Sequence, residues 1–211
     1  MEDKINHIRN WLGTGAINIF GKAFSGKDTV GQRLAKLLNA EFLGSGDIIR
    51  AARNERDARI AAAVQVSDQG GWMPTDEFRD LVLPYLADEK LRNSALILSM
   101  VGRWIGEEKP VIETLKNSGH DTHAVVVLNV SDEEIWRRWE IVGNSRNGGT
   151  RADDSDKEKI TRRLADYGDK TLPVIDVYRN MDLVIEINGE QTREEVFAEV
   201  IDKIYEFSLK H

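Results

Sequence analysis

The chain has 211 residues, of which 41% are hydrophobic and 31% charged, with a formal net charge of -7. This length and composition are typical of a globular domain with a sizeable core, and the negative charge disfavours non-specific binding to nucleic acid or anionic membranes. The lack of cysteine excludes disulfides, thiolate catalysis and cysteine-rich zinc sites, and without a long apolar stretch or a signal peptide we expect a cytoplasmic protein.

The first elements follow one another closely along the chain. Apolar residues at helical spacing within residues 1–15 predict a helical extension that packs on the core. The apolar run 16–20 is typical of a buried strand. Residues 27–38 carry apolar side chains on one helical face and predict the first helix of the core.

Four further strands are predicted downstream, because short apolar runs recur between helical patterns. These runs are residues 41–43, 95–100, 124–130 and, more weakly, 183–187. Nearly continuous apolar runs are typical of strands covered on both faces of a parallel sheet. The alternation of strands and helices predicts an α/β fold of three layers, with a central parallel sheet of about five strands.

The predicted helices have start and stop signals in the sequence. Thr75 is placed to begin one helix and Gly119 to end another. Two pairs match the capping box, in which two side chains satisfy N–H groups at a helix start: Ser131 with Glu134, and Thr192 with Glu195.

A glycine-rich loop lies between the first strand and the first core helix, with the sequence Gly21-Lys-Ala-Phe-Ser-Gly26-Lys27-Asp28-Thr29. It contains the G-x-x-x-x-G-K pattern of a phosphate-binding loop (P-loop), although an aspartate stands where Ser or Thr is usual. The glycines allow backbone N–H groups to turn inwards around a phosphate. The helix start adds a positive dipole end, and Lys27 reaches the terminal phosphates.

Two stretches fit the alternation of strands and helices poorly. Residues 47–69 have a helical pattern but are rich in arginine, and residues 143–156 are polar and rich in glycine. Solvated loops are one interpretation, and mobile lids over a ligand are the other.

Two histidines flank a carboxylate before the fourth predicted strand, as His120, Asp121 and His123. These side chains are possible metal ligands, but no further ligand is evident nearby. The pattern therefore favours a solvated turn over a metal site.

Residues 16 to about 205 resemble the adenylate kinase family and its nucleoside monophosphate kinase relatives. The glycine loop is the first shared element. Residues 44–52, Gly-Ser-Gly-Asp-Ile-Ile-Arg-Ala-Ala, look like the stretch that opens the family's monophosphate-binding lid, and residues 71–77 look like the segment that closes it. The resemblance implies acceptor-nucleotide contacts from Ser45, Arg50 and Met73.

Two further motifs of the family follow the third and fourth predicted strands. Residues 99–103, Ser-Met-Val-Gly-Arg, resemble a D-G-F-P-R motif whose arginine clamps the acceptor phosphate, which implies that role for Arg103. Residues 131–138 are similar to the helix whose arginine stacks on the donor base, which implies that role for Arg138.

A last motif surrounds the second of the two stretches that fit the alternation poorly, residues 143–156. Residues 151–154, Arg-Ala-Asp-Asp, and a later Arg-Arg-Leu are close to the family's R-x-D-D and K-R-L patterns. This implies that Arg151 and Arg163 bind the phosphoryl group during transfer. The spacing is one residue longer than usual, so Arg162 stays an alternative to Arg163, and Arg146 is a candidate for a second arginine near the lid.

The metal-binding residues depart from the family pattern. Ser99 stands where an aspartate normally organises the magnesium shell, whereas Asp28 adds a carboxylate to the glycine loop. A carboxylate there would repel the donor phosphates unless Mg²⁺ lay nearby. We therefore expect Asp28 to help to hold Mg²⁺ through water, with a helix-capping role as the alternative.

Glu107 falls where adenylate kinases commonly place a glutamine that reads adenine. An ionised carboxylate only accepts hydrogen bonds, so base reading by Glu107 would weaken selectivity for AMP. The alternative is that Glu107 begins the following helix, where the dipole favours a carboxylate.

The resemblance implies a monomeric kinase that transfers the terminal phosphoryl group of ATP to a nucleoside monophosphate with Mg²⁺, and no nucleic-acid or membrane partner. The implied organisation is one kinase domain (1–211) with its core at 16–43, 75–140 and 157–208, a monophosphate-binding lid at 44–74, a donor-side lid at 141–156 and an extension at 1–15. The implied donor contacts are Gly21, Ser25, Gly26, Lys27, Asp28, Thr29 and Arg138, and the implied catalytic residues are Lys27, Arg103, Arg151 and Arg163. A deoxynucleoside monophosphate or small-metabolite kinase and a non-catalytic nucleotide-binding module stay open as alternatives.

Overall fold

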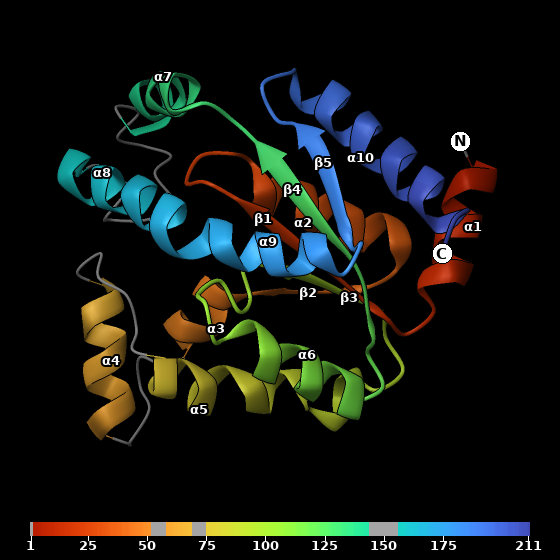
Figure 1. Cartoon of the computed structure of the whole chain (residues 1–211), viewed down its shortest axis with the longest axis horizontal. Coiled ribbons are helices and arrows are strands. Elements are labelled where there is room, and N and C mark those ends of the chain that lie inside the picture. Colours follow the sequence, from red (N-terminus) through yellow and green to blue (C-terminus); the bar gives the residue numbers. More distant parts are fainter. Residues whose placement is uncertain (1, 52–57, 69–74, 144–155) are drawn as a thin grey trace.

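A five-stranded parallel sheet forms the centre of the computed structural model, which describes residues 2–51, 58–68, 75–143 and 156–211 (Figure 1). The order of the strands across the sheet is β2-β3-β1-β4-β5. Their bounds are β1 (Ala16–Gly21), β2 (Glu41–Gly44), β3 (Leu96–Ser99), β4 (Thr122–Asn129) and β5 (Val184–Asn188). All five predicted strands are confirmed, within two residues at each end.

Helices cover both faces of the sheet, which explains why the central strands β1 and β3 are buried at every position. One face packs against α1 (Glu2–Leu12), α2 (Lys27–Leu38) and α10 (Arg193–Ser208). The other packs against α3 (Ser45–Ala51), α4 (Ala58–Asp68), α5 (Thr75–Leu86), α6 (Glu108–Asn117) and α9 (Leu172–Asn180). The predicted three-layer α/β fold is confirmed.

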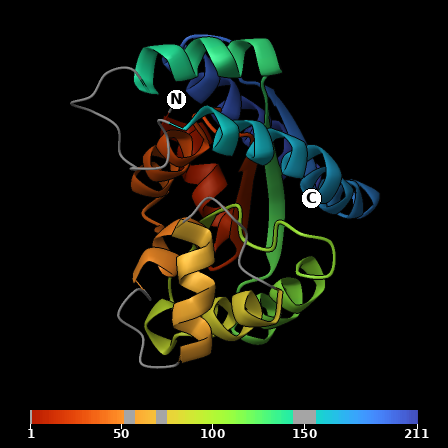
Figure 2. The same cartoon turned by 90° about the vertical axis from the view of Figure 1, so that its left-hand side faces the viewer.

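The remaining helices lie near the carboxyl edge of the sheet. They are α7 (Asp132–Gly143), α8 (Lys157–Asp166) and the short π-helix η3 (Tyr167–Thr171), which joins α8 to α9; a 3-10 turn, η2, spans Glu89–Leu91. Figure 2 looks onto this side of the molecule, with α4 and α5 below and α7 and α8 above. None of the described helices is long and apolar enough to cross a membrane.

The N-terminal helix α1 is part of the core. Ile8 and Leu12 are fully buried in the same cluster as Ile201 and Ile204 of α10, because α1 packs along α10. A salt bridge of 2.7 Å from Lys4 to Asp202 ties the two helices at the surface. The apolar spacing in residues 1–15 therefore reflects burial against the last helix.

The predicted capping signals have different outcomes. Thr192 and Glu195 form a complete capping box at the start of α10. At α7 only half of the box forms, since Ser131 Oγ accepts from the Glu134 N–H, while the Ser131 N–H donates to Glu190 at 2.7 Å. The expected box is wrong there because arginines of α7 occupy the Glu134 carboxylate.

β1 lies at the centre of the sheet, and the connections between successive strands run from there towards both edges. The chain passes from β1 to β2 on one side and from β3 to β4 on the other, so a switch point lies at the carboxyl end of β1. Asn18, buried within β1, donates to the Val101 carbonyl at 2.7 Å. This bond joins β1 to the segment that follows β3, so the two loops that lie there have a common support.

We expect Ile8→Ala to lower the free energy of unfolding by about 2–5 kcal/mol, because it leaves a cavity between α1 and α10. Urea denaturation monitored by circular dichroism measures the change. Asn10→Ala, on the exposed side of the same helix, is the control and should change stability by less than about 0.5 kcal/mol. Equal effects of both substitutions would show that α1 is not part of the cooperative core.

Candidate active site

The glycine loop connects β1 to α2 in a conformation that depends on its glycines. Gly26 caps α2 with a φ of 90°, and a Cβ at Gly21 would lie 2.5 Å from Ser25 Oγ. Phe24 also has a positive φ, of 60°. A side chain at Gly21 would clash and one at Gly26 would be strained, so both positions favour glycine. Because glycine has no side chain, the backbone N–H groups of the loop can come close to a ligand.

Polar groups of this loop suit an anion. The Ser25 hydroxyl is buried and has no hydrogen-bond partner within the described residues. Lys27 and Thr29 lie in the first turn of α2, where the positive end of the helix dipole is found. The structure thus brings together the loop residues that the sequence assigned to the donor phosphates, from Gly21 to Thr29.

Asp28 and Ser99 lie side by side, although one follows β1 and the other ends β3. The Ser99 hydroxyl donates to Asp28 Oδ1 at 2.6 Å, and the Ser99 side chain is buried. The N-cap alternative for Asp28 is wrong, because Gly26 occupies the N-cap position of α2. The Asp28 carboxylate therefore lies next to Ser99, the position at which the family usually has an aspartate.

The loop between β3 and α6 carries Arg103, which is half-buried. Glu107 lies beneath this loop with 3% of its surface exposed, and its Oε2 accepts from the Trp104 N–H at 3.2 Å. Burial raises the pKa of Glu107 to about 7, while the charge of Arg103 and N–H groups of the loop oppose the rise. Glu107 occupies the N-cap position of α6, as the second sequence interpretation expected, but its side chain does not cap the helix.

Only part of the predicted acceptor side can be described. Ser45 is buried at the start of α3, directly after β2, and Arg50 lies in the same helix, although its side chain lies outside the described residues. Met73 also lies outside them. The described part of the 44–74 insert consists of α3 and α4, which pack on α5.

Arg138 joins three segments on the donor side. Its Nη2 donates to the Gly189 carbonyl at 2.6 Å, its Nη1 to the Phe24 and Ser25 carbonyls at 3.4 and 3.3 Å, and its Nε to Glu134 at 2.7 Å. Hydrogen bonds from Arg137 and Arg138 lower the pKa of Glu134 to about 2. The N–H groups of Arg138 are thus bound to other groups of the protein. This structural role was not indicated by the sequence, which implied stacking on the donor base.

Arg163 is half-buried on α8, whereas Arg162 beside it is exposed. This difference favours Arg163 over Arg162 as the inward-facing arginine of the pair. Arg151 and Arg146 lie outside the described residues.

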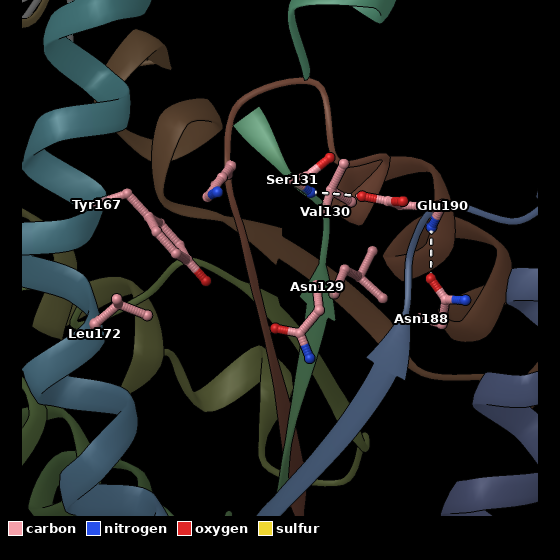
Figure 3. Close-up of a pocket in the computed structure, with 9 residues that line it drawn as sticks. Asn129, Val130, Ser131, Tyr167, Leu172, Asn188 and Glu190 are labelled. Atoms are coloured by element: carbon pink, nitrogen blue, oxygen red, sulfur yellow. Dashed lines mark hydrogen bonds between the residues drawn. The ribbon is translucent and has the colours of Figure 1, made fainter. Parts of the chain in front are cut away.

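A cavity of about 470 Å³ opens beside the glycine loop, between the carboxyl ends of β4 and β5 and the α8–α9 connection. Figure 3 shows Tyr167 and Leu172 on one wall and Asn129, Val130 and Ser131 opposite. Lys22 of the glycine loop also lines it and forms a 2.5 Å salt bridge with Asp132 at the start of α7. Sequence reasoning missed this bridge, because no local pattern pairs Lys22 with Asp132.

The expected solvated turn at His120 is wrong. His120 is fully buried, and its Nδ1 lies 2.7 Å from the Thr14 carbonyl, so the ring supports the turn before β1. In the part of the chain that the structure describes, no three His, Cys, Asp or Glu side chains gather to hold a metal ion.

We expect Glu107→Gln to stabilise the protein more at pH 8 than at pH 5. The folded-state pKa of Glu107 is about 7 against an ordinary value of 4.5, so the wild type loses stability as pH rises through this window. Glutamine cannot ionise, so the difference between the variants should grow by on the order of 2 kcal/mol. Urea denaturation at both pH values measures it, and Glu113→Gln, on the exposed side of α6, is the control. A pH-independent difference would contradict the burial of an ionisable Glu107.

Comparison with known proteins gives a consistent assignment. The family model described as adenylate kinase matches residues 19–183. The adenylate kinase of Phocaeicola vulgatus is 28% identical over 88% of this chain and 95% of its own, and that of Bacteroides thetaiotaomicron is 29% identical over 89% and 97%. Adenylate kinase 1 of a Nostoc species is 33% identical over 85% of this chain and 93% of its own. With the sheet order and the glycine loop described above, these matches show that the chain belongs to the adenylate kinase family.

Proposed function

We propose that the protein is an ATP-dependent nucleoside monophosphate kinase, most like adenylate kinase, that transfers the terminal phosphoryl group of ATP to a nucleoside monophosphate. The observation that carries the proposal is the arrangement at the switch point of the sheet. The glycine loop and Lys27 follow β1, while the loop with Arg103 follows the neighbouring strand β3. Two phosphate-binding groups on adjacent strands suit two nucleotides aligned for transfer.

Magnesium fits the oxygen groups next to the glycine loop. Mg²⁺ in kinases is usually held by nucleotide phosphates, water and only one or two carboxylates. Asp28, with Thr29 beside it and the Ser99 hydroxyl on its Oδ1, supplies such a set without a full cage of protein ligands. When bound with ATP, Mg²⁺ neutralises the charge of the donor phosphates, and Asp28 would orient its water shell.

The remaining roles in the reaction follow from charge. Arg103 and Arg50 would hold the acceptor phosphate, because a guanidinium grips phosphate oxygens at two points, and the Ser45 hydroxyl would contact the acceptor nucleotide. Arg163 and Arg151 would approach from the donor side, and Arg138 would keep the glycine loop next to the donor base. The segments 44–74 and 141–156 would act as lids that exclude water during transfer.

A non-catalytic nucleotide-binding module is the alternative from a different functional class. The main argument for this alternative is that Ser99 replaces the aspartate that is usual in the family. The carboxylate of Asp28 beside Ser99 weakens that argument. Diphosphate production from ATP, Mg²⁺ and each common monophosphate or deoxynucleoside monophosphate separates the two functions and identifies the acceptor.

We expect Lys27→Ala to abolish detectable phosphotransfer and to leave the melting temperature nearly unchanged. Lys27 lies at the start of α2 beside the phosphate site, so its loss should remove transition-state stabilisation without opening the core. Steady-state kinetics and a melting curve measure the two effects. Lys36→Ala, on the exposed side of the same helix, is the control, and near-normal turnover by Lys27→Ala would overturn the proposed function.

We expect Asp28→Asn to raise the Mg²⁺ concentration needed for half-maximal rate by on the order of tenfold, the usual effect of a group that acts on a metal through another ligand. Asparagine keeps an oxygen for the Ser99 hydroxyl but removes the charge. Calorimetric titration of ATP with and without Mg²⁺ adds a readout that does not depend on turnover. Asp3→Asn, in the first turn of α1, is the control, and an unchanged Mg²⁺ dependence of both rate and binding would reject this role for Asp28.

A further inference from the structure

The loop that carries Arg103 has a constrained backbone. Met100, directly after β3, has a φ of 56°, and Gly102 and Gly106 have φ values of 67° and 94°. A Cβ at Gly102 would lie 3.0 Å from Val111 Cγ2, so the loop packs tightly on the start of α6. Such a conformation persists only where surrounding groups hold it.

Two buried carboxylates supply that support from below. Glu107 Oε2 accepts from the Trp104 N–H at 3.2 Å, and the Glu107 N–H donates to the Trp104 carbonyl at 2.9 Å. Glu108 Oε2 accepts from the Gly106 N–H at 2.6 Å. The two carboxylates thus bind backbone N–H groups on the carboxyl side of Arg103, within three residues of it.

We propose that Glu107 is a positioning residue, which holds the loop so that Arg103 meets the acceptor phosphate, and that it does not read the acceptor base. The inference rests on the proposed kinase function. It assigns Glu107 a role different from that of the base-reading residue at this place in the family pattern.

The burial of Glu107 distinguishes the two roles. A base reader must present its polar edge to the ligand, whereas Glu107 is 3% exposed and accepts a hydrogen bond from the backbone of its own loop. Removing a buried acceptor leaves an N–H without its partner, which costs more than losing an exposed contact. The loop, and Arg103 with it, would then lose its fixed position.

The charges around Glu107 are consistent with a fixed loop. Arg103 stabilises the Glu107 carboxylate, and Glu108 opposes it from the next position. From the packed elements opposite, Lys170 of η3 lies 4.4 Å from the Trp104 ring centroid, and Tyr178 of α9 is buried near Glu108. Groups of α6, η3 and α9 therefore surround the part of the loop on the carboxyl side of Arg103.

The proposal predicts an effect on the acceptor that does not depend on its base. Glu107→Ala should raise KM for AMP, GMP, CMP and UMP by a similar factor, on the order of tenfold, and change KM for ATP less than twofold. Glu107→Gln keeps an oxygen acceptor for the Trp104 N–H and should restore acceptor KM to within about threefold of wild type. The order of preference among the four bases should be the same in all three proteins.

Steady-state kinetics at saturating ATP, at a temperature well below each variant's melting point, test this prediction. Hydrogen exchange of the Trp104 amide provides a second measurement, with faster exchange expected in Glu107→Ala than in wild type and Glu107→Gln. Glu113→Ala on the exposed side of α6 is the control for both. Effects confined to melting temperature, with KM unchanged, would reduce Glu107 to a stabilising residue and overturn the positioning role.

The outcomes separate this inference from the proposed function. A tenfold change in the AMP preference of Glu107→Gln would show base reading and overturn the inference, while the kinase function would stand. A normal acceptor KM in a folded Glu107→Ala would also overturn the inference, as it would leave Glu107 no part in acceptor binding, and the kinase function would again stand. A wild type inactive on every monophosphate would overturn the kinase function itself, and the positioning role with it.

Discussion

The central position of β1 is the constraint on which the rest of the structure depends. β1 pairs with β3 on one side and β4 on the other, and helices bury both of its faces. Because all five strands are parallel, their carboxyl ends share one edge, and the loops after β1 and β3 are neighbours there. The Asn18 side chain joins β1 to the segment that follows β3, through the Val101 carbonyl. The site thus lies at the ends of the central, fully buried strands of the sheet.

Electrostatics at this edge depend on three carboxylates that are bound by groups of the protein. Asp28 shares a hydrogen bond with Ser99, Glu107 is buried under Arg103, and Glu134 orients two arginines of α7. A carboxylate near a phosphate site would be repulsive if it were free. Here Glu107 is bound to the backbone of the Arg103 loop and Glu134 to the guanidinium groups of Arg137 and Arg138, so both carboxylates have partners within the protein.

Local sequence patterns predicted the strands, the glycine loop and the α10 capping box, because these depend on burial or on contacts within a few residues. They failed where the partner is distant in sequence. Ser131 pairs with Glu190 across 59 residues, and the backbone carbonyl that binds His120 lies 106 residues away. The importance of Ser99 was evident from the family pattern, but its hydroxyl bond to Asp28, 71 residues away, required the fold.

The packing of α1 on α10 has a consequence for biosynthesis. Ile8 and Leu12 leave the ribosome long before their hydrophobic partners Ile201 and Ile204 are made. Until then the apolar side of α1 lacks the part of its native cover that α10 provides, so the nascent chain carries an exposed apolar surface that chaperones can bind. Vectorial synthesis therefore leaves the closing of this layer as a late event in folding.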